Sequence, residues 1–177
     1  MNELFIQGFG LVAAILGISA VQWKRRSTIL FILLVANVFW VIHFSLLGAY
    51  SGSALNLAGM IVIAVFFIFD NRSTRPQWLV GACIVLMIMA GLLTWDGWVS
   101  LLPTLGMIAG TVAISQINEQ RIRVLSIATS ILWLGYNVIV LSYVGAVKEI
   151  ITILSTLIAL WRFRRQGLSE VTVQKNS

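Results

Sequence analysis

The sequence predicts an all-α membrane protein in which seven transmembrane helices form two parallel three-helix repeats joined by a linker helix (3+1+3). Three observations lead to this fold class. The chain is 59% hydrophobic and 10% charged, whereas soluble domains are about 25% charged. It contains seven apolar stretches whose lengths suit helices that cross a bilayer. The pattern Trp-x9-Tyr-x-Gly occurs twice, from Trp40 to Gly52 and from Trp133 to Gly145.

The apolar stretches follow one another with short connections, so we expect a single transmembrane bundle over residues 1–166. The predicted helices are about 4–22, 28–48, 53–69, 77–94, 98–116, 122–142 and 146–162. The first three make up repeat one (about 4–69), and the last three make up repeat two (about 98–162). The helix at about 77–94 is the linker. Two three-helix units with the same orientation need one such additional crossing of the membrane to be joined in one chain. Residues 167–177 are predicted to be a polar cytoplasmic tail.

The basic residues indicate how the chain is oriented. Eleven of the twelve Lys and Arg residues fall on one side of the predicted helices, and Lys148 is the exception. Short loops that carry Lys and Arg stay in the cytoplasm, so we expect the N-terminus outside and the C-terminus inside. This pattern is typical of membrane orientation, and a nucleic-acid partner is therefore not expected despite the net charge of +6. Membrane lipids are the expected surroundings.

Polar residues inside the apolar stretches mark the candidate site, because polar groups in lipid face the bundle interior or a wet cavity. In the second and sixth predicted helices they lie three or four residues apart, which places them along one face of each helix. Asn56 and Glu149 occupy matching positions in the third and seventh helices, 93 residues apart. We expect the following residues to bind substrate: Asn37, Trp40, His43, Asn56, Ser130, Trp133, Tyr136, Asn137 and Glu149.

These residues also have structural interpretations, which the sequence leaves open. The Asn and Ser side chains can hydrogen-bond neighbouring helices, and the two indoles can be packing residues. His43 is either a hydrogen-bonded structural residue or a gate that responds to protons. Glu149 is either a pocket carboxylate or an interfacial partner of Lys148. Pro103, inside the predicted fifth helix, removes a backbone hydrogen bond and is a candidate hinge or a static bend.

The sequence contains none of the usual signs of an enzyme. There is no carboxylate pair or His/Cys cluster with metal-ligand spacing, no phosphate-binding glycine loop that ends in Lys, and no nucleophile elbow. The single cysteine, Cys83, cannot form an internal disulfide. We therefore expect no catalytic residues, no metal and no cofactor.

Four segments occur in a recognisable combination, namely Gln7-Gly-x-Gly10, Ile42-His-Phe-x-Leu-Leu-Gly-x-Tyr50, Leu55-Asn56 and Leu101-Leu-Pro-x-x-Gly106. Together they resemble the YgjV-like family of bacterial inner-membrane proteins. The resemblance runs over about residues 5–168, while Gly59 and Tyr136 replace an arginine and a second histidine of the family pattern. The resemblance implies a location in the bacterial inner membrane, and it does not point to a particular activity. The family is distantly similar to the PQ-loop group, which includes the SWEET sugar transporters and the KDEL receptor and implies the 3+1+3 arrangement.

These observations predict a transporter or facilitator that moves a small polar solute by alternating access between the two three-helix units. A polar pocket between the second and sixth helices is the feature that this function requires. The alternative is a membrane receptor or scaffold that has the same polar pocket and does not transport. The sequence does not indicate an oligomeric state.

Overall fold

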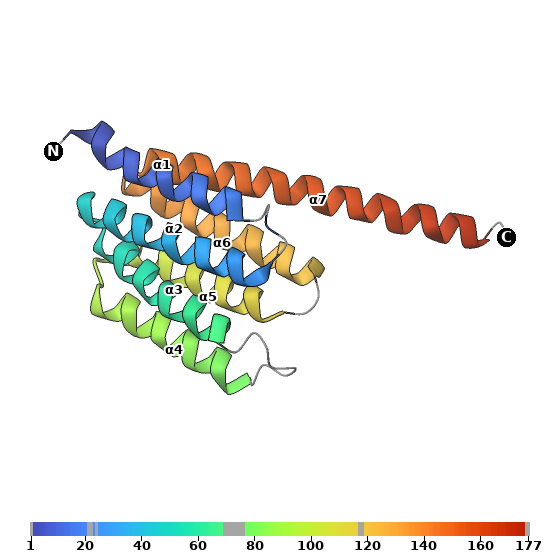
Figure 1. Cartoon of the computed structure of the whole chain (residues 1–177), viewed down its shortest axis with the longest axis horizontal. Coiled ribbons are helices and arrows are strands. Elements are labelled where there is room, and N and C mark those ends of the chain that lie inside the picture. Colours follow the sequence, from blue (N-terminus) through green and yellow to red (C-terminus); the bar gives the residue numbers. More distant parts are fainter. Residues whose placement is uncertain (1, 21–22, 24, 69–76, 117–118, 176–177) are drawn as a thin grey trace.

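The computed structural model describes residues 2–20, 23, 25–68, 77–116 and 119–175, with side chains up to residue 162 except those of residues 26 and 119. This part of the chain forms seven α-helices and one 3-10 turn, and it contains no strand (Figure 1). The elements are α1 (Glu3–Ala20), α2 (Arg26–Leu46), α3 (Tyr50–Ile68), α4 (Gln77–Leu93), η1 (Trp98–Ser100), α5 (Leu101–Ser115), α6 (Glu119–Ile139) and α7 (Tyr143–Lys175). The prediction of an all-α chain with seven helices is confirmed.

Six of the described helices are long and apolar enough to cross a membrane. They are α1, α2, α3, α5 together with η1, α6 and the first 20 residues of α7. The remaining helix, α4, is equally apolar but has 17 residues. At 1.5 Å per residue it is about 26 Å long, slightly less than the roughly 30 Å of a hydrocarbon core. The protein is therefore a multi-pass membrane protein with six full-length candidate spans and one shorter apolar helix.

Six of the helices form a closed ring. Chain neighbours pack together in two groups, α1 with α2 and α2 with α3, then α5 with α6 and α6 with α7. Contacts of α1 with α7 and of α3 with α5 join these groups, so α2 and α6 face each other across the ring. Helix α4 lies outside the ring and packs on α3 and α5 (Figure 1).

Two predicted elements differ from the structure. Helix α7 was expected to end near residue 162, but it continues to Lys175 and extends well past the other helices (Figure 1). Residues 167–175 thus belong to the helix and not to a separate tail. The one glycine among them is compatible with this, since a glycine costs a helix only about 1 kcal/mol. Pro103 lies in the first turn of α5, since the 3-10 turn precedes it. A missing N–H breaks no hydrogen bond in the first turn of an α-helix, and the hinge or static bend at Pro103 stays a prediction.

The α2–α3 and α6–α7 turns have the same backbone conformation. Gly48 and Leu141 both have positive φ, at 72° and 58°. The amides of the next residues, Ala49 and Ser142, each donate to the carbonyl five positions earlier at 2.9 Å. This is the Schellman arrangement, in which a left-handed residue ends a helix. We call the end of the bundle that carries these two turns the turn end, and the end that carries Arg25, Arg121 and Arg162 the basic end.

The positive φ of Leu141 leads to a stability prediction. A side chain with a Cβ atom in the left-handed region costs about 1 kcal/mol or more, and glycine avoids this cost. Leu141→Gly is therefore expected to raise the free energy of unfolding by about 0.5–1 kcal/mol, and Gly48→Ala to lower it by about 1 kcal/mol. Denaturant unfolding in detergent micelles measures both changes. Two changes of the same sign would contradict this account of the turns.

Candidate functional site

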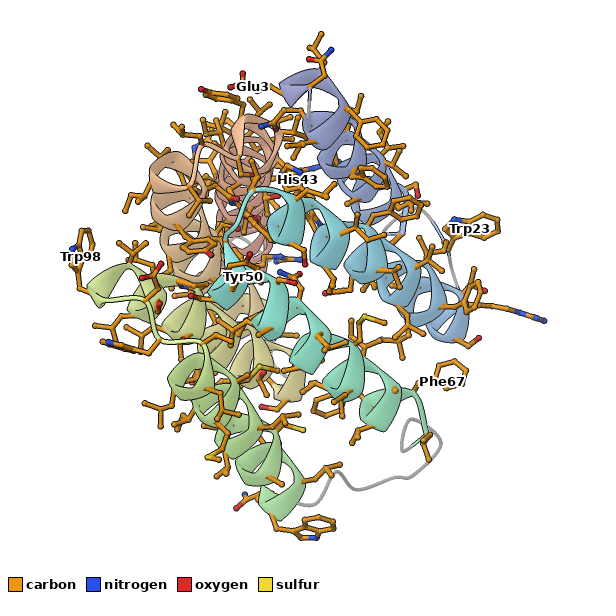
Figure 2. All side chains as sticks on the ribbon, turned by 90° about the vertical axis from the view of Figure 1, so that its left-hand side faces the viewer. Glu3, Trp23, His43, Tyr50, Phe67 and Trp98 are labelled. Atoms are coloured by element: carbon orange, nitrogen blue, oxygen red, sulfur yellow. The ribbon has the colours of Figure 1, made fainter. Side chains whose placement is uncertain are left out.

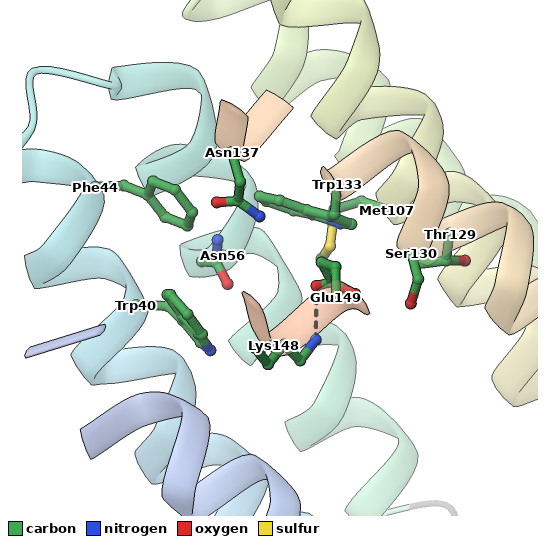
Figure 3. A pocket seen from close by; sticks show the side chains of 10 residues that line it. All are labelled: Trp40, Phe44, Asn56, Met107, Thr129, Ser130, Trp133, Asn137, Lys148 and Glu149. Atoms are coloured by element: carbon green, nitrogen blue, oxygen red, sulfur yellow. Dashed lines mark hydrogen bonds and ion pairs between the residues drawn. The ribbon is translucent and has the colours of Figure 1, made fainter. Parts of the chain in front are cut away.

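A cavity lies within the ring of helices, and we call it the central cavity (Figure 3). It has a volume of about 180 Å³ and takes side chains from α2, α3, α5, α6 and α7. Its lining residues are Trp40, Phe44, Asn56, Met107, Thr129, Ser130, Trp133, Asn137, Lys148 and Glu149. Sites for drug-sized ligands begin at about 300 Å³, so this space suits a smaller molecule.

Aromatic side chains join α2 to α6 on one side of the central cavity. Trp40 stacks on Phe44 with ring centroids 5.7 Å apart, and Phe44 contacts Trp133 at the same separation. Trp133 meets Tyr136 edge-on, also at 5.7 Å. Gly106 of α5 makes room for the indole, because a Cβ atom there would lie 2.9 Å from Trp133 Cδ1. Trp40, Phe44 and Trp133 form an apolar wall of the cavity, and Tyr136 packs against this wall from outside the cavity.

The central cavity also has a charged wall, formed by Lys148 and Glu149 at the start of α7. The Lys148 Nζ atom lies 2.7 Å from Glu149 Oε1 (Figure 3). The Glu149 side chain is 7% exposed, while that of Lys148 is 29% exposed. Neighbouring residues on a helix point in different directions, so the long Lys148 side chain has to fold back to reach its partner. The two charges neutralise each other, and no other lining residue of the cavity carries a formal charge.

Two amide side chains add hydrogen-bonding atoms to the cavity. Asn56 donates from Nδ2 to the Gly52 carbonyl at 2.8 Å, which leaves its oxygen available. Asn137 is almost completely buried, and its Oδ1 atom, which has no hydrogen-bond partner among the described residues, is packed against Gly145 of α7. The Asn56 oxygen is therefore the amide acceptor that the protein itself does not use.

His43 lies outside the central cavity and connects three segments of the chain (Figure 2). It is fully buried, with Nδ1 at 2.9 Å from the Ile6 carbonyl and Nε2 at 2.8 Å from Ser142 Oγ. A carbonyl only accepts hydrogen bonds, so Nδ1 carries the proton and Nε2 accepts from the serine hydroxyl. A Cβ atom on Gly10 would lie 3.0 Å from the imidazole, so this glycine lets α1 approach. Both ring nitrogens are satisfied, which supports the structural interpretation of His43.

Tyr136 makes a second connection across the bundle. Its hydroxyl accepts from the Gly52 amide at 2.8 Å and donates to the Ala49 carbonyl at 3.3 Å. The first amides of a helix have no partner within that helix, so the tyrosine of α6 caps the start of α3. Tyr136 does not line the central cavity. It lines a second cavity of about 190 Å³ at the turn end, which also includes Asp96 and Ser100.

The structure brings most of the predicted site residues together. Those that line the central cavity are Trp40, Asn56, Ser130, Trp133, Asn137 and Glu149. His43 and Tyr136 lie at the turn end, and Asn37 donates to the Leu33 carbonyl of its own helix at 2.8 Å. Four lining residues are absent from the predicted substrate-binding set, namely Phe44, Met107, Thr129 and Lys148. Helical spacing from Trp40 and Trp133 points to two of them, Phe44 and Thr129, whereas nothing in the sequence singles out Met107.

The chain is similar in sequence to known bacterial membrane proteins. The family model Imp-YgjV, described as bacterial inner membrane protein, matches residues 4–167. The inner membrane protein YgjV of Escherichia coli (strain K12) is 27% identical over 172 residues, which cover 96% of this chain and 91% of that protein. No solved structure matches the chain. Among the described residues, no group of three His, Cys, Asp or Glu side chains is placed to hold a metal ion.

The hydroxyl of Tyr136 is expected to contribute measurably to stability. Tyr136→Phe leaves the buried Gly52 amide without a partner, and the expected loss is about 1–3 kcal/mol of unfolding free energy. Tyr143→Phe is the matched control, because its ring is 59% exposed and its hydroxyl has no recorded partner among the described residues. Thermal unfolding of both variants in detergent tests this. Equal stability of the two variants would show that the cap at Gly52 is unimportant.

Proposed function

The chain belongs to the YgjV family of bacterial inner-membrane proteins, and we propose that it is a facilitator that carries a small polar solute across that membrane. In this proposal, transport proceeds by alternating access between two three-helix units, α1–α3 and α5–α7, which form a 3+1+3 arrangement with α4 as the linker. One observation carries the proposal above all. The central cavity lies between the two units and is lined by residues at matching positions of both.

The helix boundaries support two related units. Helices α2 and α6 begin 93 positions apart, at Arg26 and Glu119, and they also end 93 positions apart. Helices α3 and α7 begin at Tyr50 and Tyr143, with the same separation. The two left-handed turn residues described above are also 93 positions apart. A shared offset in helix ends and in turn conformation is what a duplicated three-helix unit would produce.

Reciprocal hydrogen bonds between the units support a pseudo-two-fold relation. His43 of the first unit reaches Ser142 of the second, and Tyr136 of the second unit reaches Ala49 of the first. The members of each contact exchange units under the 93-residue offset. A twofold axis along the membrane normal relates two such contacts in this way, and this is one of the known plans of transporters built from parallel repeats.

A second pair of contacts follows the same rule. The Gln7 side chain accepts a hydrogen bond from the Val144 amide at 3.4 Å, and the Ser51 and Ser100 hydroxyls lie 2.8 Å apart. Ser100 follows Gln7 by 93 positions, and Val144 follows Ser51 by the same number. All of these contacts lie at the turn end. They join the first helix of one unit to the start of the last helix of the other.

Matched pairs of residues line the central cavity itself. Trp40 and Trp133 occupy one pair of positions, and the other pairs are Phe44 with Asn137 and Asn56 with Glu149. A solute in this space contacts both units at once, which alternating access requires. The polar members of the pairs come mainly from the second unit, so the expected site is symmetric in position and asymmetric in chemistry.

The charges support an orientation in which the turn end faces the periplasm. Among the described residues Arg25, Arg121 and Arg162 lie at the basic end, and short basic segments stay in the cytoplasm. The cross-unit hydrogen bonds lie on the opposite side of the central cavity. We therefore assign this structure to a state that is closed toward the periplasm.

Uptake into proteoliposomes tests the proposal directly. The wild-type chain is expected to take up at least one solute from a panel of sugars, amino acids and nucleobases. Trp133→Leu should lower that uptake at least tenfold, because about 1.4 kcal/mol of lost binding is a factor of ten. Trp78→Leu is the matched control, since this indole is 67% exposed on α4 outside the ring. No uptake of any panel member would count against transport.

A reversible cross-link tests alternating access. Ser51→Cys with Ser100→Cys, in a Cys83→Ala background, places two thiols where hydroxyl oxygens lie 2.8 Å apart in different units. Oxidation should abolish uptake and reduction should restore it. Ser45→Cys with Ser53→Cys is the control, because these hydroxyls are also 2.8 Å apart but lie within one unit. If the first cross-link forms completely and uptake continues, the two units do not separate at the turn end. Binding without uptake would favour the alternative, a non-transporting receptor or scaffold.

A further inference from the structure

We infer that the solute held in the central cavity is a small zwitterion that carries both an ammonium and a carboxylate group, as an amino acid with a short side chain does. The inference rests on the proposed function of this site and names the chemical class of its solute. It starts from the charged wall, where Lys148 and Glu149 place one positive and one negative group side by side on the cavity.

The ion pair indicates the charges that a ligand must carry. In this structure the Lys148 ammonium and the Glu149 carboxylate are each other's charged partner, at 2.7 Å. A ligand with a single charge takes one member of the pair and leaves the other unpaired inside the membrane, which is costly. A zwitterion bonds to both members, because its carboxylate takes Lys148 and its ammonium takes Glu149. The exchange keeps the net charge of the cavity at zero and leaves no charge without a partner.

The acceptor atoms favour an ammonium group over a hydroxyl group. An ammonium donates three hydrogen bonds, whereas a hydroxyl donates one. The cavity offers three acceptor oxygens, which are the two of the Glu149 carboxylate and the one of Asn56. In Figure 3 the Asn56 oxygen points toward the space between Trp40 and Glu149. A neutral polyol would satisfy these atoms one by one, but it would make no use of the Lys148 charge.

The aromatic wall and the volume limit the rest of the ligand. Trp40 and Trp133 both line the cavity, and an indole face attracts a cationic group that lies within about 6 Å. The same rings, with Phe44 and Met107, provide apolar contact for a short hydrocarbon side chain. At about 180 Å³ the cavity is too small for a peptide. These features together describe a compact amino acid whose charged groups face α7.

Calorimetry on the purified full-length chain tests the inference with defined probes. The zwitterions are glycine, L-alanine, L-serine and L-proline, and the comparison compounds are ethylamine, propionate and D-glucose. At least one zwitterion is expected to bind, with an affinity at least about tenfold higher than that of each comparison compound, as expected for one charged hydrogen bond. Failure of all four zwitterions to bind would overturn the inference. Preferential binding of D-glucose, or of a compound with one charge, would also overturn it.

Variants of the charged wall give the second arm of the test. Lys148→Met should weaken zwitterion binding at least about tenfold, and Glu149→Gln should do the same. Arg25→Met is the control that removes a positive charge outside the cavity, at the basic end, and it should stay within about threefold of the wild type. The thermal midpoint of each variant shows whether it is folded. If folded Lys148→Met binds the zwitterion as tightly as the wild type, the assignment of Lys148 is wrong.

The binding measurement tests the ligand class and the uptake measurement tests transport, so failure of one proposal can be told from failure of the other. A zwitterion that binds with the expected dependence on Lys148 and Glu149 but is not taken up would refute transport and leave the assigned ligand class intact. Uptake of a neutral solute without binding of any zwitterion would support transport and refute the ligand class. The calorimetric measurement requires no assumption about alternating access.

Discussion

The hydrogen bonds that the buried His43 and Tyr136 side chains make across the bundle are the interactions on which the rest of this structure depends. In a membrane, helices have little hydrophobic reason to prefer one another, so close packing and interhelical hydrogen bonds decide which helices meet. His43 ties the first two helices to the α6–α7 turn, and Tyr136 ties α6 to the start of α3. Both bonds lie at the turn end, where they close the ring above the central cavity.

The shape of the central cavity depends on how closely the helices around it can pack. Gly106 lets Trp133 lie close to α5, so the indole stands on the cavity wall beside Phe44. The aromatic wall then separates the central cavity from the second cavity at the turn end. In the proposed transport cycle, this wall and the hydrogen bonds around it are the barrier that must open toward the periplasm.

Hydropathy was sufficient to predict the number and type of helices, but it misplaced several of their ends. The second helix was expected to end near residue 48 and ends at Leu46, because the apolar residues of the Schellman turn look like continued helix. The turn at Leu141 could not be predicted for the same reason, since a leucine in the sequence does not indicate a positive φ. The repeated tryptophans did lead to the cavity. His43 and Tyr136 could not be placed, because their partners belong to helices distant in the sequence.

The two cross-bundle contacts have different chemistry although they occupy corresponding places. One joins an imidazole to a serine hydroxyl, and the other joins a phenol to backbone groups. A chain made of two copies of the first unit would place His43 opposite Ala49, which has no hydroxyl to donate. Under the proposed 3+1+3 arrangement, each unit is therefore complementary to its partner and not to itself. On that proposal the protein corresponds to a fused heterodimer, and a half expressed alone would lack the surface needed to assemble with its own copy.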